Sequence, residues 1–300
     1  MKQKEYFSKE IRWLILPLIL AIILAVLSFS GCGEKAAGPE ETGATTSAGA
    51  LSQPELGKLI SDAALALVQA SAYKVDLDMN MAAKASSGNE TSQGVYTITI
   101  KGEIDQLARK SHVTVFISSN IEKSGNLSSY NETIEMYILP EWVYTKTEIP
   151  QWVKKPYTGE AAAMYLSAIE QQLALLKSVT DLKFLKYETL DGADCYVVEF
   201  TPDPVSIASW LLNYTILGIS QDTSDKFSKT FKNLTCTAWI DKKTKLLKNM
   251  DIVLGITPEN VSADINMTMK MYDYNQPVDI TLPPETANAF QFPSGASPKQ

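Results

Sequence analysis

Residues 73–81 read Tyr-Lys-Val-Asp-Leu-Asp-Met-Asn-Met, and this stretch decides the fold because apolar and polar side chains alternate along it without a break. An alternation of period two is typical of a half-buried β-strand, whose successive side chains point to opposite faces of a sheet. The apolar phase consists of Tyr73, Val75, Leu77, Met79 and Met81. The stretch therefore predicts a strand that turns one face toward a core.

The same alternation recurs downstream. It is found in residues 96–100, 113–117 and 134–138, and a shorter run follows at residues 142–144. A polar turn is predicted over residues 83–94, and an irregular exit is predicted around Pro150, Trp152 and Pro156. Five successive strands with short polar connections predict an antiparallel meander.

The second half of the chain returns to the sheet after a helical insertion. A period near 3.6 predicts a helix over residues 160–179, and Asp203-Pro204 opens a second, short helix. Between them, Asp191-Gly192 is a strong turn signal for a hairpin of residues 184–190 and 195–200, with Ala193 expected to lengthen its loop. A further hairpin is predicted over residues 234–253, and a last long strand over residues 261–271.

The first strand is preceded by a predicted helix over residues 52–70. Ser52 and Glu55 have the spacing of a capping box, and Pro54 falls in the first turn, where its missing N–H costs nothing. These elements together predict an α+β fold in which helices cover one face of a large curved antiparallel sheet.

The N-terminal stretch from Trp13 to Cys32 predicts the location of the domain. Basic residues precede an apolar run over residues 14–29, and Ser30-Gly31-Cys32 closes it, which is the signature of a secretory signal peptide. The small residues before Cys32 resemble a bacterial lipobox, in which the cysteine thiol is acylated and the chain is cut just before it. An uncleaved membrane anchor is the alternative. Both interpretations place a tethered domain on the extracytoplasmic side of the cell membrane.

The chain accordingly divides into four segments. They are a lipoprotein signal peptide over residues 1–31, the lipidated Cys32 with a flexible linker over residues 32–51, one domain over residues 52–284, and a disordered tail over residues 285–300.

Composition and motifs argue against nucleic-acid binding, catalysis and metal binding. The formal charge of −7 disfavours nucleic acid as a partner. His112 is the only histidine, it lies in the outward phase of its strand, and no G-x-S-x-G elbow accompanies it. With no second histidine or close cysteine pair, a zinc site is disfavoured as well. We expect no catalytic residues, no metal and no cofactor.

Two cysteines remain once Cys32 is assigned to the lipobox. Cys195 and Cys236 both lie in strand-like runs, and an exported domain can keep a disulfide. The sequence thus predicts a Cys195–Cys236 disulfide, with two buried free thiols as the alternative.

Methionines on strands are the unusual feature of this sequence. Those on the apolar phase are Met79, Met81, Met136, Met267, Met269 and Met271. Methionine has a lower strand propensity than valine or isoleucine, whereas its flexible thioether suits a surface that accepts ligands of irregular shape. A plain core that uses methionine as filler is the alternative.

Several local patterns carry a resemblance to a known superfamily. They are Ala70-Ser-Ala-Tyr73, Met136-Tyr137, Trp142-Val-Tyr144, Trp152-Val-Lys154, residues 190–198, Ala238-Trp-Ile-Asp-Lys-Lys-Thr244, and the closing Tyr274-Asn-Gln-Pro-Val278-Asp-Ile280. Across most of residues 52–284 the chain resembles bacterial lipoproteins related to the LolA-type carriers and the LppX/LprG lipid-transfer lipoproteins. These motifs are structural rather than catalytic.

The resemblance implies an incomplete β-barrel with helices packed on its concave face and acyl chains held between sheet and helices. The cavity would be lined by Met79, Met81, Ile100, Val115, Met136, Met267, Met269 and Met271, and helices near Met164 and Trp210 would form a lid. The expected function is to bind or transfer a lipid or other hydrophobic ligand at the membrane. The alternative is a cell-surface interaction or structural module with a filled core and no ligand.

Overall fold

The computed structural model describes residues 51–87, 90–147, 151–156, 179–204, 228–257 and 261–291. The predicted signal peptide, Cys32, the linker up to residue 50 and all but the last residue of the helix predicted over residues 160–179 lie outside these ranges. So do Met164, Trp210 and the continuation of the helix predicted from Asp203-Pro204.

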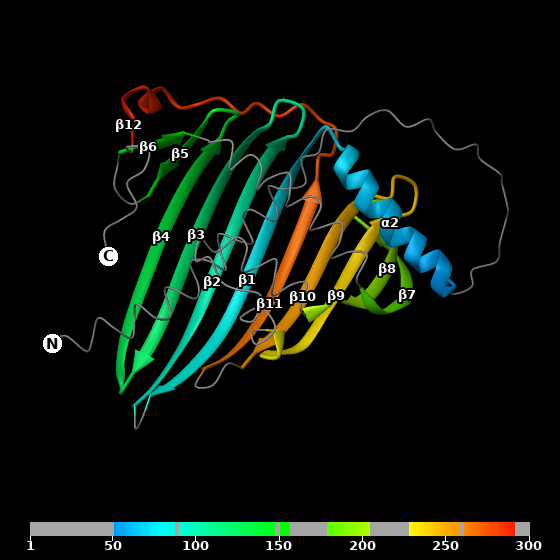
Figure 1. Ribbon diagram of the computed structural model, residues 1–300, viewed down its shortest axis with the longest axis horizontal. Helices are drawn as coiled ribbons and strands as arrows, with labels where there is room; N and C mark the ends of the chain where they lie inside the picture. Colours follow the sequence, from blue (N-terminus) through cyan, green and yellow to red (C-terminus); the bar gives the residue numbers. More distant parts are fainter. Residues whose placement is uncertain are drawn as a thin grey trace.

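A large open sheet forms the body of the described protein (Figure 1). Its strands are β1 (Ala72–Ser87), β2 (Glu90–Asp105), β3 (Lys110–Lys123), β4 (Asn126–Ile138), β5 (Trp142–Lys146), β6 (Val153–Pro156), β7 (Thr180–Leu190), β8 (Ala193–Thr201), β9 (Phe231–Asp241), β10 (Leu247–Ile256), β11 (Val261–Tyr272) and β12 (Phe290–Gln291). They lie side by side in the order β12-β6-β5-β4-β3-β2-β1-β11-β10-β9-β8-β7. All neighbours are antiparallel except β12 and β6. The predicted large antiparallel sheet is confirmed.

The two halves of the chain meet where β1 pairs with β11. Residues 74–85 of β1 pair without interruption with residues 261–272 of β11. The meander β1–β6 extends from this seam in one direction and β11–β7 in the other. The first predicted strand is therefore central, and both its edges pair with long neighbours.

Strict alternation gives the sheet two different faces. The face that carries Met79, called the apolar face below, is lined chiefly by Tyr73, Val75, Leu77, Met79 and Met81 of β1, Tyr96, Ile98, Ile100 and Ile104 of β2, Val113, Val115 and Ile117 of β3, Ile134 and Met136 of β4, Met250, Ile252 and Leu254 of β10, and Ile265, Met267, Met269 and Met271 of β11. The opposite phase, called the polar face, carries mainly hydroxyl, amide and charged side chains.

The α-helix α2 (Gln53–Gln69) forms where the capping box predicted it. The Glu55 carboxylate accepts hydrogen bonds from the Ser52 N–H at 2.7 Å and from the Ser52 hydroxyl at 2.6 Å. One stripe of α2, including Leu56 and Ile60, packs against Val198 and other residues of β7–β9. Figure 1 shows α2 beside this end of the sheet. Of the several helices expected, α2 is the α-helix that the described ranges contain in full.

Two connections differ from the sequence prediction. The turn predicted over residues 83–94 is much shorter, because β1 continues to residue 87 and β2 begins at residue 90. The β7–β8 hairpin turns on Asp191 and Gly192 alone, both with positive φ, and Ala193 already pairs with Leu190. Positive φ at both central residues is the geometry of a two-residue type I′ turn, so Ala193 does not lengthen the loop.

The C-terminal part of the described chain is more ordered than predicted. A 3-10 helix, η1 (Pro284–Asn288), and the short strand β12 occupy residues that were predicted to begin a disordered tail. Phe290 pairs with Val153 of β6, a strand that stands where an irregular exit was predicted. Trp152, Tyr137 and Ile280 pack together beneath this segment, which explains why both parts are ordered.

The predicted Cys195–Cys236 disulfide is wrong, because both thiols are free and buried. In the β8–β9 ladder Cys195 pairs with Asp241, whereas Cys236 pairs with Phe200, five residues farther along β8. An odd number of residues places the two thiols on opposite faces of the sheet, and five residues span roughly 16 Å. A disulfide needs α-carbons within about 7 Å. Burial also raises the pKa of Cys236 to about 12, which keeps this thiol protonated.

Candidate ligand-binding face

The apolar face gathers every predicted cavity residue that lies in the described ranges. Met79 pairs with Met267 on β11 and with Ile98 on β2, and the next pair along β1 joins Leu77 to Met269. Ile100, Val115, Met81, Met136 and Met271 lie on the same face. The predicted set is thus brought together on five adjacent strands. That these residues line a ligand cavity stays a prediction.

The methionine residues of the apolar face differ in how deeply they are buried. Met79 is 0% exposed and Met271 1%, so their thioethers are fully enclosed. Met267, which lies directly opposite Met79, is only partly buried. The same holds for Met250 on β10, which pairs with Met269. The face therefore contains both fixed and accessible thioethers within one continuous patch.

Met250 is a member of this face that sequence reasoning missed. It shares the phase of Ile252 and Leu254, which was the available signal. The alternation is obscured because the β9–β10 ladder shifts register between Leu247 and Asn249. Such a bulge changes the phase of a strand relative to the residues before it.

Tyr96 is the second residue that sequence reasoning missed as a site candidate. Its ring lies on the apolar face beside Met81, and its hydroxyl is buried without a hydrogen-bond partner among the described residues. Burial raises the pKa of Tyr96 to about 12, so the phenol stays neutral at physiological pH. A buried hydroxyl without a partner is costly, and it is the natural polar contact for a ligand on an otherwise apolar surface.

The apolar face becomes more polar toward the β3–β4 hairpin. Ser119 replaces the aliphatic residues on β3, and on β4 the Tyr130 hydroxyl donates to the Glu132 carboxylate. Tyr96 lies at this boundary, since it pairs with Ser119 on β3. An amphipathic molecule would therefore find an apolar surface and a polar border on the same side of the sheet.

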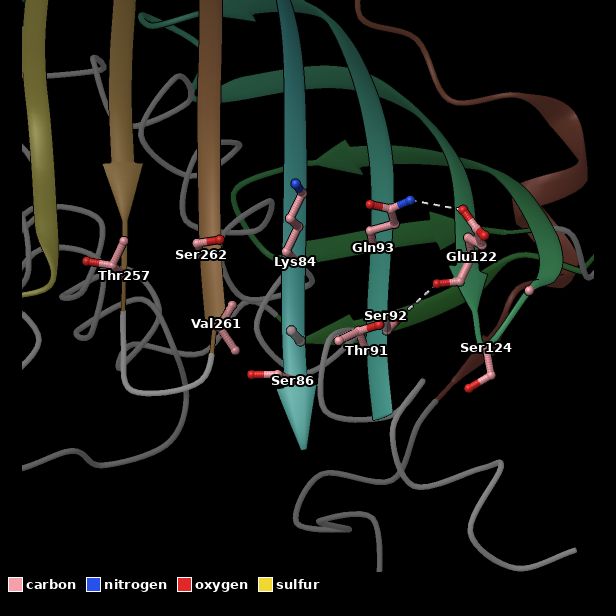
Figure 2. A pocket seen from close by; sticks show the side chains of 12 residues that line it. Lys84, Ser86, Thr91, Ser92, Gln93, Glu122, Ser124, Thr257, Val261 and Ser262 are labelled. Atoms are coloured by element: carbon pink, nitrogen blue, oxygen red, sulfur yellow. Dashed lines mark hydrogen bonds between the residues drawn. The ribbon is translucent and has the colours of Figure 1, made fainter. Parts of the chain in front are cut away.

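A pocket of about 510 Å³ lies at the ends of β11, β1, β2 and β3 (Figure 2). Ser262, Lys84, Gln93 and Glu122 form one row across these strands, because each pairs with the next in register. The Gln93 amide Nε2 donates to the Glu122 carboxylate at 2.9 Å, as Figure 2 shows. Half of its twelve lining residues are serine or threonine, so hydroxyl groups gather at this end of the sheet.

His112 occupies the outward phase that the sequence predicted. Its Nε2 lies 3.2 Å from Glu135 Oε1, and its ring stacks on Tyr137 with centroids 4.3 Å apart. Burial, reinforced by the neighbouring Glu135 carboxylate, raises the pKa of Tyr137 to about 12. The described surroundings of His112 are a stacked aromatic pair and a carboxylate on the side of the sheet away from the methionines.

Metal-ligand clusters and membrane-spanning helices are both absent from the described ranges. Within residues 51–291, apart from the gaps given above, no three His, Cys, Asp or Glu side chains come together as metal ligands. None of the helices described there has the length and apolar character needed to cross a membrane.

Solved structures with a related arrangement include bacterial lipoproteins. Lipoprotein LppX of Mycobacterium tuberculosis matches at 14% identity with a TM-score of 0.40, covering 77% of this chain and 100% of that one. LprF of Mycobacterium bovis matches at 15% identity with a TM-score of 0.44, covering 78% and 99%. A Vibrio parahaemolyticus domain named for outer membrane lipoprotein sorting matches at 10% identity with a TM-score of 0.21, covering 73% and 94%. LppX, LprF and the lipoprotein-sorting domain are proteins of the kinds that the sequence resembles.

Sequence comparison gives one further finding. A family model described as a family of unknown function (DUF6612) matches residues 56–291, and no curated protein matches the chain.

Proposed function

The chain belongs to the family of unknown function DUF6612, and for this member we propose an extracytoplasmic lipoprotein that binds or transfers a lipid or other hydrophobic ligand. The ligand would lie against the apolar face, between the sheet and the helices expected to cover it. Acylated Cys32 would hold the protein on the outer surface of its membrane. The proposal also keeps the predicted division into signal peptide, linker and domain.

The observation that carries the proposal is the continuous methionine-rich apolar face. Met79, Met267, Met269 and Met250 are neighbours on three adjacent strands. An unbranched thioether side chain has three rotatable bonds and adapts to irregular shapes, which an acyl chain of variable conformation requires. Each CH₂ group of a ligand buried here would contribute about 0.8 kcal/mol.

Tyr96 supports an amphipathic ligand in particular. Its buried hydroxyl lies at the border between the methionine cluster and the more polar end of the same face. A ligand carbonyl or hydroxyl group at this border would accept or donate the hydrogen bond that Tyr96 lacks among the described residues. Alkyl chains would then extend from this point toward Met79.

The alternative function is a surface interaction module with a filled core. The observation that favours it is the near-complete burial of Met79, Val115 and Ile98 at the centre of the apolar face. In that case the methionines are packing residues, and the exposed polar face is the functional surface.

Native mass spectrometry with solvent extraction separates these functions. Residues 33–300, expressed without Cys32, would be sprayed under native conditions and then extracted with organic solvent. A discrete added mass that extracts as lipid supports the carrier and identifies its ligand class. A clean apo mass, with no uptake when phospholipid or fatty acid is offered, contradicts it.

A conservative exchange tests the role of the thioethers. Met267→Leu and Met269→Leu preserve side-chain volume, so we expect little loss of stability but altered ligand retention. Leu182→Met, a reverse exchange in the cluster beneath α2, is the matched control. Ligand retention that is the same in all three variants would count against a specific role of the methionines.

A further inference from the structure

The polar face of β1–β4 has an ordered pattern that the proposed function does not use. Its residues form rows across the strands, because each pairs in register with the next. Three consecutive rows are Ala82–Val95–Asn120–Ser129, Asn80–Thr97–Ser118–Asn131 and Asp78–Thr99–Phe116–Thr133. Apart from Asp78, these rows are uncharged and consist largely of hydroxyl and amide side chains.

Part of this surface is hollowed. A depression of about 840 Å³ is lined by Thr97, Thr99, Phe116, Ser118, Asn131 and Thr133 of these rows, and its border carries Ile117, Glu132, Glu135, Lys146 and Thr147. The pocket of Figure 2 begins one row beyond Ala82–Val95–Asn120–Ser129, at Lys84, Gln93 and Glu122. Two of the three rows thus line the first depression, and the pocket of Figure 2 lies one row beyond the third.

Apolar side chains interrupt the polar rows at two exposed points. Phe116 is 44% exposed and Val95 53%, although both point away from the core. An aromatic ring that is partly exposed among hydroxyl groups offers a flat apolar surface to a partner with an apolar face. Around Phe116 the neighbours in register are Thr99 and Thr133, so hydroxyl groups flank the ring on both sides.

The hydroxyl groups of this surface are held in place by bonds within the sheet. The Thr99 hydroxyl donates to Asp78 Oδ1 at 2.7 Å, and the Thr97 hydroxyl donates to Asn80 Oδ1 at 3.2 Å. The Ser129 hydroxyl donates to Asn120 Oδ1 at 2.7 Å. With their protons committed, these hydroxyl oxygens are oriented as acceptors for an external donor. The Asp78 carboxylate accepts one of these bonds and is the single formal charge in the three rows.

The spacing of neighbouring residues within a row fits one class of partner. Neighbouring strands lie about 4.8 Å apart, which is close to the length of one pyranose unit in an extended glycan. Sugar rings present hydroxyl donors at their edges and C–H groups on their faces, which match an acceptor row and an exposed aromatic ring. A polyanion is disfavoured because the three rows carry no cation.

We propose that the polar face of β1–β4 binds an extended neutral glycan that runs across the strands, with one sugar face on Phe116 and ring hydroxyls donating to Thr97 and Thr99. This site is separate from the apolar face, on the other side of the sheet, and does not depend on ligand binding there. It gives a protein tethered in the envelope a second contact, with polysaccharide.

Titration of the full chain in phospholipid nanodiscs with chitohexaose tests the site, with empty nanodiscs as the blank. We expect Phe116→Ala to weaken binding at least tenfold. Thr99→Val removes one hydroxyl while keeping the side-chain shape, and we expect a severalfold loss. Val253→Ala is the matched control, since Val253 is an exposed apolar residue on the same face but on β10.

Three results would overturn the proposal. They are no measurable binding by the unaltered chain, unchanged affinity in Phe116→Ala, and binding of a sulfated glycan in preference to chitohexaose. Lipid retention measured on Phe116→Ala keeps the two proposals distinguishable. Retained lipid with lost glycan binding supports the glycan site alone, and equal loss of both indicates a folding defect that circular dichroism would detect, in which case Thr99→Val decides.

Discussion

Replacement of Met79 by alanine is the sharpest test of how the apolar face is packed. Met79 lies at the centre of the sheet, flanked by Met267 on β11 and Ile98 on β2, and its side chain is 0% exposed. Truncation of a fully buried methionine to alanine costs about 2–5 kcal/mol, from lost transfer free energy and the cavity left behind. Because neighbours on both strands are fixed by long uninterrupted ladders, the site has little freedom to collapse. We expect a loss of about 3 kcal/mol.

The free energy of unfolding is best measured by urea denaturation of residues 33–300 followed by circular dichroism, after removal of bound lipid. Delipidation matters because a ligand that binds only the folded state adds its own stabilisation. In a thermal scan the same loss lowers Tm by about 6–12 °C for a domain of this size. Met79→Leu conserves volume and should cost less than about 1.5 kcal/mol.

Val253→Ala serves as the control, because Val253 is 47% exposed on the polar face and should lose less than about 0.5 kcal/mol. A loss below about 1 kcal/mol for Met79→Ala, or a loss equal to that of the control, would refute the argument. It would mean that the centre of the apolar face is loosely packed and that the Met79 side chain contributes little to the packing of the core.

Three further predictions concern other parts of the chain. Ser52→Ala removes the hydroxyl that donates to Glu55 at the start of α2, and should cost about 1 kcal/mol in thermal unfolding; an unchanged Tm contradicts the capping assignment. Gly102→Ala places a Cβ 2.9 Å from Val75 Cγ1 and should cost about 1–3 kcal/mol in urea; a neutral effect would mean that the strands separate easily. Cys236, whose pKa is raised to about 12 by burial, should stay unreactive toward a thiol reagent at pH 8 until the protein unfolds, and rapid labelling of the native protein would contradict its burial.

Local patterning was sufficient to predict most of the strands. Residues 73–81 show a period of two because one face is buried and the other is solvated, and that constraint acts on each residue separately. The capping box at Ser52 and the turn at Asp191-Gly192 are equally local, since each depends on side chains within four residues. These elements appear where the sequence predicted them.

Local patterning did not predict the exact ends of the elements or the places where a strand departs from strict alternation. The register shift before Asn249 hid Met250, because a bulge is a relation between two strands. The short strand β12 obtains its backbone partners from β6, and β6 obtains its own from β5 on one side and β12 on the other. A polar stretch such as residues 83–94 has no preference between turn and strand until long neighbours on both sides satisfy its backbone groups.

What the sequence by itself determined is which residues alternate, where α2 begins, and that methionine recurs on one phase of the strands. Only the tertiary structure decided which strands are neighbours, and hence that β1 pairs with β11 and that Met79 faces Met267. It also decided that the two cysteines form no disulfide, since Cys195 and Cys236 lie on neighbouring strands but on opposite faces of the sheet. The physical reason is that alternation specifies the face of a residue relative to its own strand, whereas the register between strands is set by contacts distant in the chain.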